Sequence, residues 1–177
     1  MYPNENIRRV FLGSAIALFA LPMMGAMCLI AGADEEASIT IGVLGLAGLG
    51  WLFATGFYWI YDTWNGVPTE GADVPLVGRM TPGLAAGLLL VPVLNVPWLF
   101  IANTSLADAL NHALRQEGSS REVPKWLAIA ACGALMIPFA QLVLGTGLFY
   151  WWMLTVDQAR EELARLRGPK RQWHNAF

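Results

Sequence analysis

The stretch VPVLNVPW, residues 91–98, lies in the middle of the third of four long apolar runs. It contains Pro92 and Pro97, with Asn95 between them. Proline lacks a backbone N–H and its ring crowds the carbonyl four residues earlier, so a helix through this stretch must bend or break. In lipid, the freed backbone groups need partners from side chains, neighbouring helices or water. We expect this stretch to be a hinge in shape and not a site of chemistry.

Apolar residues dominate the rest of the chain as well. Of its 177 residues, 56% are hydrophobic and 14% are charged, whereas a soluble domain usually has about 25% charged residues. The four runs cover residues 10–32, 39–61, 82–103 and 126–154, and about 20 apolar residues suffice to cross a bilayer. The sequence therefore predicts an all-α integral membrane protein. Residues 1–177 would form a single membrane domain with four transmembrane helices.

The distribution of Lys and Arg predicts the orientation. With four crossings, the N-terminus, the 62–80 loop and the C-terminus share one side of the membrane. That side holds eight of the Lys and Arg residues, and the other side holds three. Because cytoplasmic loops are enriched in these residues, we expect both termini in the cytoplasm and the protein in a bacterial inner (cytoplasmic) membrane. Arg8, Arg9 and the run after them loosely resemble a secretion signal, but the run is too long for one.

Prolines leave room for a competing topology. In that interpretation residues 82–101 form a re-entrant hairpin, because Pro92 and Pro97 could reverse the chain. Three crossings would remain, and the cationic C-terminal tail would move outside, against the charge rule. The four-crossing topology, with a kinked third helix, is therefore preferred.

Small and polar residues inside the runs predict how the helices associate. Glycines allow close backbone approach in lipid, and the candidates for helix packing are Gly42, Gly45, Gly48, Gly83 and Gly87. Packing within the chain is the first interpretation, and contact with another protein is the second. Asn95 and Gln141 lie near mid-span, so we expect a polar core there, with a hydrogen bond of about 0.5–2 kcal/mol.

Aromatic residues near the run ends predict the membrane–water boundaries. Trp and Tyr are enriched at both interfaces of a bilayer. The expected interface aromatics are Tyr58, Trp59, Tyr61, Trp64, Trp98, Trp126, Trp151 and Trp152.

Two polar segments follow the third and fourth runs. Residues 105–117 form an amphipathic pattern, with Ser105 as a possible cap and Gly118 as a stop, and would extend the third span or lie on the membrane surface. Residues 155–168 would continue the fourth helix into the cytoplasm, before a basic end at 169–177. Heptad spacing and charge make six residues of this tail candidates for contact with a partner or with lipid headgroups: Val156, Leu163, Arg165, Leu166, Lys170 and Arg171.

Residues that could carry chemistry are scarce. The four runs contain no Asp, Glu, Lys, Arg or His, and the two histidines, His112 and His174, lie outside them. Cys28 and Cys132 have no partner at metal-ligand spacing, so we expect free thiols. A net charge of −2 argues against nucleic acid as a partner. We therefore predict no catalytic residues, no metal, no cofactor and no small-molecule substrate.

Residues 79–114 carry a resemblance. RMTPGLAAGLLLVPVLNVPWLFIANTSLADALNHAL resembles small bacterial multi-pass membrane proteins of unknown function, namely the DUF4328-like proteins and the membrane part of GYF-domain proteins. The resemblance covers about a fifth of the chain and implies architecture but no activity. It rests on Thr81, Pro82, Gly83, Gly87, Pro92, Asn95, Trp98, Phe100 and Asn111.

These observations favour a non-enzymatic accessory or scaffold subunit. It would contact membrane lipids and pack against other integral membrane proteins of a larger complex. One alternative is a small oligomeric transporter or channel, with Asn95 and Gln141 lining a polar path. Another is a lipid-interacting membrane sensor.

Overall fold

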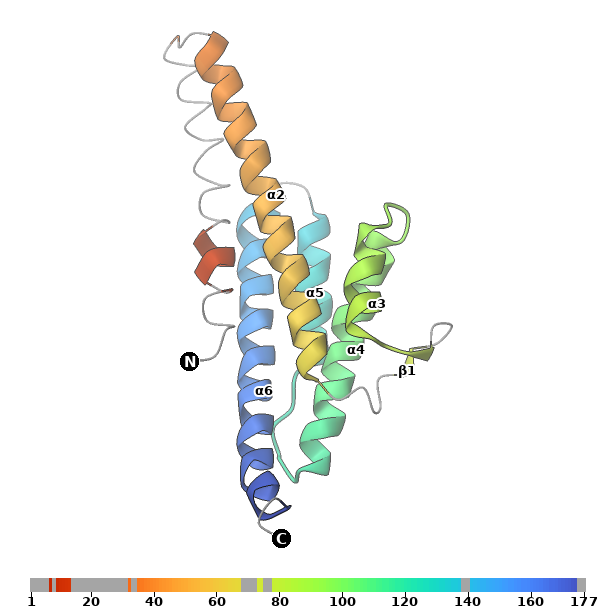
Figure 1. Ribbon diagram of the computed structural model, residues 1–177. Coiled ribbons are helices and arrows are strands. Elements are labelled where there is room, and N and C mark those ends of the chain that lie inside the picture. The colour runs from red at the N-terminus through yellow and green to blue at the C-terminus, as the bar shows by residue number, and fades with distance from the viewer. Residues whose placement is uncertain are drawn as a thin grey trace. The chain divides into compact units, whose positions relative to one another are not determined.

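The computed structural model describes residues 7, 9–13, 32, 35–67, 73–74, 78–137 and 141–174, and these are mostly helical (Figure 1). The predicted all-α class is confirmed. The chain divides into two compact units, Met1–Trp59 and Ile60–Phe177, and each is considered by itself. Residues 9–13 are helical. The rest of the predicted 10–32 span, including Cys28, lies outside the described residues apart from Gly32.

Helix α2 (Glu35–Gly66) is a single helix of 32 residues, about 48 Å long at 1.5 Å per residue. It includes the predicted 39–61 span and extends it at both ends. Its sequence contains several glycines but no proline, so every residue can donate to the helical ladder. Within the described ranges, its Ile39–Gly66 portion is the one helix with the length and apolar composition needed to cross a membrane.

The third apolar run folds back on itself. Thr81 caps α3 (Pro82–Gly87) by accepting a hydrogen bond from the Leu84 N–H at 3.2 Å, with Pro82 in the first turn. A 3₁₀ turn, η1 (Leu88–Leu90), leads to a bend at 91–94, and α4 (Asn95–Gln116) then returns beside α3 (Figure 1). The indole Nε1 of Trp98 donates to the carbonyl of Ala85 at 2.9 Å. Thirteen residues of continuous helix would separate these two by about 20 Å, so the predicted kinked third helix is wrong and the chain forms a hairpin.

The fourth apolar run also reverses. It consists of α5 (Lys125–Met136), a π-helical turn, η2 (Gln141–Gly145), and α6 (Thr146–His174). The rings of Trp126 and Trp151 lie 6.0 Å apart, centroid to centroid, whereas one continuous helix would place them about 37 Å apart. The prediction of a single helix over 126–154 is therefore wrong. At its other end α6 passes the expected stop at Gly168-Pro169 and continues to His174, since a helix can tolerate a proline by giving up one hydrogen bond.

Both reversals occur at a residue that precedes a proline. Val91, before Pro92, has φ −87° and ψ 111°. Ile137, before Pro138, has φ −88° and ψ 115°. A proline ring clashes with a helical residue in front of it and pushes that residue into the extended region. Each run therefore leaves the helical conformation at one X-Pro step, and long-range packing determines that it turns back.

Helices α4, α5 and α6 form a three-helix bundle in the unit 60–177 (Figure 1). The expected polar helix over 105–117 is the second half of α4, so Ser105 lies inside a helix and does not cap one. Its apolar face is buried, at Leu106, Ala107, Leu110, Ala113 and Leu114. Gly118 ends α4 as predicted, with φ +79°, a conformation that glycine adopts without steric cost.

A two-residue β-ladder precedes α3. Strand β1 (Asp73–Val74) pairs antiparallel with β2 (Gly78–Arg79), Asp73 lying opposite Arg79. Val74 and the neighbouring Met80 are buried. The ladder is a small addition to a helical unit.

Candidate functional site

The two ends of the three-helix bundle carry different surfaces. We call residues 60–67, 104–125 and 155–168 the polar half, and residues 82–103, 126–137 and 141–154 the apolar half. Helices α4 and α6 run through both halves, and hairpin turns close the apolar half (Figure 1). The apolar half contains no charged residue. The boundary between the halves is the most distinctive feature of this unit.

Ion pairs connect the elements of the polar half. They join α4, the 117–124 segment, the start of α5, and α6, and the pairs are Asp108–Lys125, Arg115–Glu122, Arg121–Glu162 and Glu117–Arg167. Asn111 adds two hydrogen bonds to the extended segment: its Nδ2 donates to the Val123 carbonyl at 3.0 Å, and its Oδ1 accepts from the Val123 N–H at 2.7 Å. Exposed pairs such as Arg115–Glu122 stabilise little individually. Together these contacts hold the connection between α4 and α5 in one conformation.

Glu162 lies where this connection meets α6. The hydroxyl of Ser119 donates to its Oε1, and Arg121 lies near its Oε2. The Ser119 hydrogen bond is the largest cause that holds the pKa of Glu162 below its ordinary value of 4.5, and Arg121 and Arg165 act in the same direction. Glu162 is therefore charged at neutral pH and marks the hydrated surface of the polar half.

A half-buried charge cluster joins the end of α2 to α6. Arg160 Nη1 donates to Asp62 Oδ2 at 3.3 Å, and Nη2 donates to the Asp62 carbonyl at 3.3 Å. The same guanidinium lies 3.8 Å from Asp157, whose side chain is only 3% exposed. A Cβ added to Gly66 would lie 2.5 Å from Arg160 Nη2, so a larger residue there would require the guanidinium to shift. Cations are favourable at a helix C-terminus, and this one holds the last turns of α2 against α6.

A polar contact also lies in the core near the boundary. Trp152 Nε1 donates to Asn103 Oδ1 at 2.7 Å, and Asn103 Nδ2 donates to the Leu99 carbonyl at 2.8 Å. Both side chains are buried. Nearby, the thiol of Cys132 is free and buried. The polar core of the bundle is therefore Asn103 with Trp152.

The predicted polar core of Pro92, Asn95, Pro97 and Gln141 does not form. Asn95 and Gln141 are exposed at the two hairpin turns, and among the described contacts no hydrogen bond joins their side chains. In one straight helix per run, these two residues would lie near the middle of the membrane. In the hairpins they lie at the turns. Pro92 and Pro97 flank the first turn, where Pro97 occupies the first turn of α4.

The predicted interface aromatics separate into two groups. Tyr58, Tyr61, Trp126 and Trp151 are exposed, while Trp59, Trp64, Trp98 and Trp152 are buried in the fold. A single helix over 126–154 would place Trp126 and Trp151 near opposite faces of the membrane. Instead the two rings meet edge to face at 78°, beside the Asp108–Lys125 ion pair at the start of α5.

The predicted tail contacts also separate. Val156 and Leu163 are buried in the bundle core and are not available to a partner, because their heptad spacing serves contacts within the chain. Arg165 is exposed and Leu166 half-buried. The side chains of Lys170 and Arg171 lie outside the described residues.

Close backbone approach occurs at glycines other than the predicted ones. A Cβ on Gly145 would lie 3.0 Å from the backbone of Ala134, where the second hairpin is tightest. A Cβ added to Gly42, Gly45, Gly83 or Gly87 meets nothing within 4 Å, and Gly48 is half-buried. Among the described residues, Gly42, Gly45, Gly83 and Gly87 therefore make no close packing contact within the chain.

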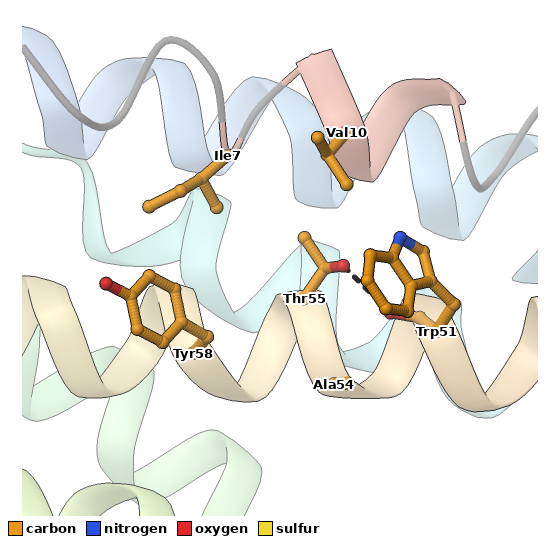
Figure 2. Close-up of a pocket in the computed structure, with 6 residues that line it drawn as sticks. All are labelled: Ile7, Val10, Trp51, Ala54, Thr55 and Tyr58. Carbon is orange, nitrogen blue, oxygen red and sulfur yellow. Dashed lines mark hydrogen bonds between the residues drawn. The ribbon is translucent and has the colours of Figure 1, made fainter.

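A shallow apolar pocket lies in the unit 1–59. It has a volume of about 310 Å³, and Figure 2 shows its lining of Ile7, Val10, Trp51, Ala54, Thr55 and Tyr58. The Thr55 hydroxyl is already bonded to the carbonyl of Trp51 at 2.8 Å. The pocket offers mainly hydrocarbon contact.

Sequence reasoning missed Arg160, Asn103 and Gly145. The pairing of Asp62 with Arg160 spans 98 residues, and no local pattern indicates it. Pro138 could have indicated the second reversal, because it interrupts the fourth run as Pro92 interrupts the third. In the part of the chain that the structure describes, no group of three His, Cys, Asp or Glu residues could hold a metal ion. No family model, curated protein or solved structure matches this chain.

Proposed function

We propose that the protein is a non-enzymatic accessory or scaffold subunit of the bacterial inner membrane. Helix α2 and the apolar run 10–32 cross the bilayer, and both termini lie in the cytoplasm with the polar half. Other integral membrane proteins pack against its apolar surfaces. This replaces the four crossings expected from the sequence, because the runs 82–103 and 126–154 are hairpins.

The observation that carries the scaffold proposal is the open face of α2. Its large apolar side chains are exposed along the helix at Ile39, Val43, Leu44, Trp51, Phe53 and Tyr58. At 100° per residue, Gly42 lies on the same side of the helix as Ile39 and Phe53, and a Cβ added there meets nothing within 4 Å. In lipid, helices associate where small residues let backbones approach closely. The face therefore suits a second transmembrane helix.

The oligomeric transporter or channel remains the alternative proposal. Asn95 and Gln141 lie exposed at two different hairpin turns, so within one chain they do not line a common path. The open face of α2 favours the scaffold role.

Purification in mild detergent followed by native mass spectrometry tests the scaffold role. We expect the chain to be recovered with a specific protein partner. Gly42→Leu would fill the open face and should abolish that association, while Val43→Leu, at an exposed position already occupied by an apolar side chain, should preserve it. Recovery of the unaltered chain as a lone monomer would refute the proposal.

A further inference from the structure

The two hairpin turns present mainly apolar side chains outward, and each also exposes one uncharged amide, Asn95 or Gln141. At the first turn the exposed residues are Leu90, Val91, Val93, Leu94 and Val96, and Val93 is 85% exposed. At the second they are Met136, Ile137 and Leu144. Contiguous exposed apolar surface of this kind marks a contact with another apolar phase.

The length of the helices in the apolar half limits how far this surface can extend into a bilayer. Helix α5 has 12 residues, about 18 Å in length, and the part of α4 between Asn95 and the ion-paired Asp108 is similar. A bilayer's hydrocarbon core is about 30 Å thick. The hairpins are therefore too short to cross a bilayer, and long enough to enter it from one side.

Most backbone N–H groups of the first turn are paired within the protein, the exception among residues 91–95 being that of Val93. Backbone groups in hydrocarbon must be paired within the protein. The N–H of Val91 bonds to the Leu88 carbonyl at 3.3 Å, and the N–H groups of Leu94 and Asn95 bond to the Val91 carbonyl at 2.9 Å. Pro92 has no N–H to satisfy. The proline that breaks the helix thus also removes a donor that lipid would leave unpaired.

The boundary between the halves has the chemistry of a membrane surface. Trp126 and Trp151 are exposed there, beside Lys125. Tryptophan prefers the headgroup level of a bilayer, and lysine can reach from it toward water and anionic headgroups.

Charge supplies the independent argument. If both hairpins enter and leave on the side of the C-terminus, all 11 Lys and Arg residues lie on one side of the membrane. The loop at 33–38 on the other side carries only acidic charges, at Asp34, Glu35 and Glu36. Four crossings would divide the cations eight to three. The positive-inside rule thus favours the topology that the fold supports.

We infer that the apolar half is inserted into the bilayer from the cytoplasmic side, with its two hairpin turns in contact with phospholipid acyl chains. The segments 82–103 and 126–154 are re-entrant hairpins, and the polar half remains in the cytoplasm at the headgroup level. This inference rests on the membrane location in the proposed function, and does not depend on the scaffold role.

Cysteine labelling with a membrane-impermeant maleimide tests this topology in right-side-out and inverted inner-membrane vesicles. The full chain carries Cys28→Ser and Cys132→Ala, plus one new cysteine. We expect Ser120→Cys to label only in inverted vesicles, as does the cytoplasmic control Ala164→Cys, while Glu36→Cys labels only in right-side-out vesicles. Glu122→Cys repeats the test if Ser120→Cys folds poorly. Labelling of the 120 or 122 variant only from the outside would restore four crossings and overturn the inference.

The depth of insertion into the bilayer is tested at the first hairpin turn. Val93→Cys should resist the impermeant reagent from both sides. When it carries an environment-sensitive fluorophore in phosphatidylethanolamine–phosphatidylglycerol vesicles, acyl-chain bromination should quench it several-fold more than a fluorophore at Ala164→Cys. Equal quenching, or aqueous labelling of Val93→Cys, would overturn insertion. If Glu36→Cys and Ala164→Cys label from the same side, the membrane location of the proposed function fails instead.

Discussion

The polar and apolar halves of the bundle are built from the same helices and are stabilised in different ways. In the polar half, Arg160 forms ion pairs with both Asp62 and Asp157, and surface ion pairs stabilise the α4–α5 connection. In the apolar half no charge is present, and the hairpin closes where Gly145 lets α5 and η2 touch backbone to backbone. A single helix such as α6 is therefore stabilised by ion pairs in one half and by close apolar packing in the other. This difference suggests where substitutions should act.

Arg160→Gln should have the largest effect, because it removes the cation that lies between Asp62 of α2 and Asp157 of α6. Removing one partner of a buried pair costs about 3–5 kcal/mol, and we expect the lower end because Arg160 is 20% exposed. Denaturant unfolding in detergent, followed by circular dichroism, measures the change in free energy. Arg165→Gln, on the exposed side of α6, is the control and should stay within about 0.5 kcal/mol. Equal effects of the two would show that the cluster does not stabilise the polar half.

Asn103→Ala tests the boundary, where a polar contact lies inside an otherwise apolar core. It leaves the buried indole N–H of Trp152 without its acceptor, which costs about 1–3 kcal/mol. The control is Asn95→Ala on the same helix, whose side chain is exposed, with an expected change within about 0.5 kcal/mol. The same unfolding measurement applies. A larger loss of unfolding free energy in the Asn95 variant would indicate that the polar core includes Asn95, as expected from the sequence.

Gly145→Ala tests the apolar half by forcing α5 and η2 apart. Overpacking costs about 1–3 kcal/mol, and a gain in helix propensity of up to about 1 kcal/mol offsets part of it. We expect a net loss of about 1–2 kcal/mol. Gly147→Ala, where a Cβ meets nothing within 4 Å, should be neutral or stabilising. If both variants behave alike, backbone contact does not close the second hairpin.

Ser119→Ala should produce the smallest effect, on the exposed surface of the polar half. Losing the hydroxyl should raise the pKa of Glu162 toward 4.5, because its hydrogen bond is the main cause of the lowered pKa. A depressed pKa in the folded state stabilises above the unfolded pKa, and this stabilisation is lost as the pH falls through the folded pKa. The variant should lose it at higher pH. Carboxyl ¹³C titration by NMR in detergent micelles reads the shift, and Ser120→Ala, expected to leave Glu162 unchanged, is the control.

Local chemistry was predictable from the sequence. The Thr81-Pro82 start of α3 and the Gly118 stop of α4 follow from backbone rules that act over a few residues. Helix α2 was predictable because nothing in its sequence interrupts it. The amphipathic pattern of residues 105–117 was also predictable, and its apolar face, with Leu106, Leu110 and Leu114, is buried in the bundle.

The candidate site was less predictable, because each of its parts depends on contacts between distant residues. Asn103 and Trp152 are 49 positions apart, and Asp62 and Arg160 are 98 positions apart. Exposed and buried tryptophans look alike in a sequence, so Trp126 and Trp152 were given the same role. Their burial depends on which helix face meets the bundle.

By itself, the sequence determined where the chain is apolar, where it is charged and where its helices can start and stop, because hydrophobicity, capping and proline geometry are local properties. Pro92 and Pro138 marked the positions where the third and fourth runs could leave the helical conformation, and Val91 and Ile137 do so. Whether each run then bends or reverses was decided only by the tertiary structure. The Trp98–Ala85 hydrogen bond and the Gly145–Ala134 approach exist only once the two arms of each hairpin have come together, and contacts between arms are what distinguish a hairpin from a kinked helix.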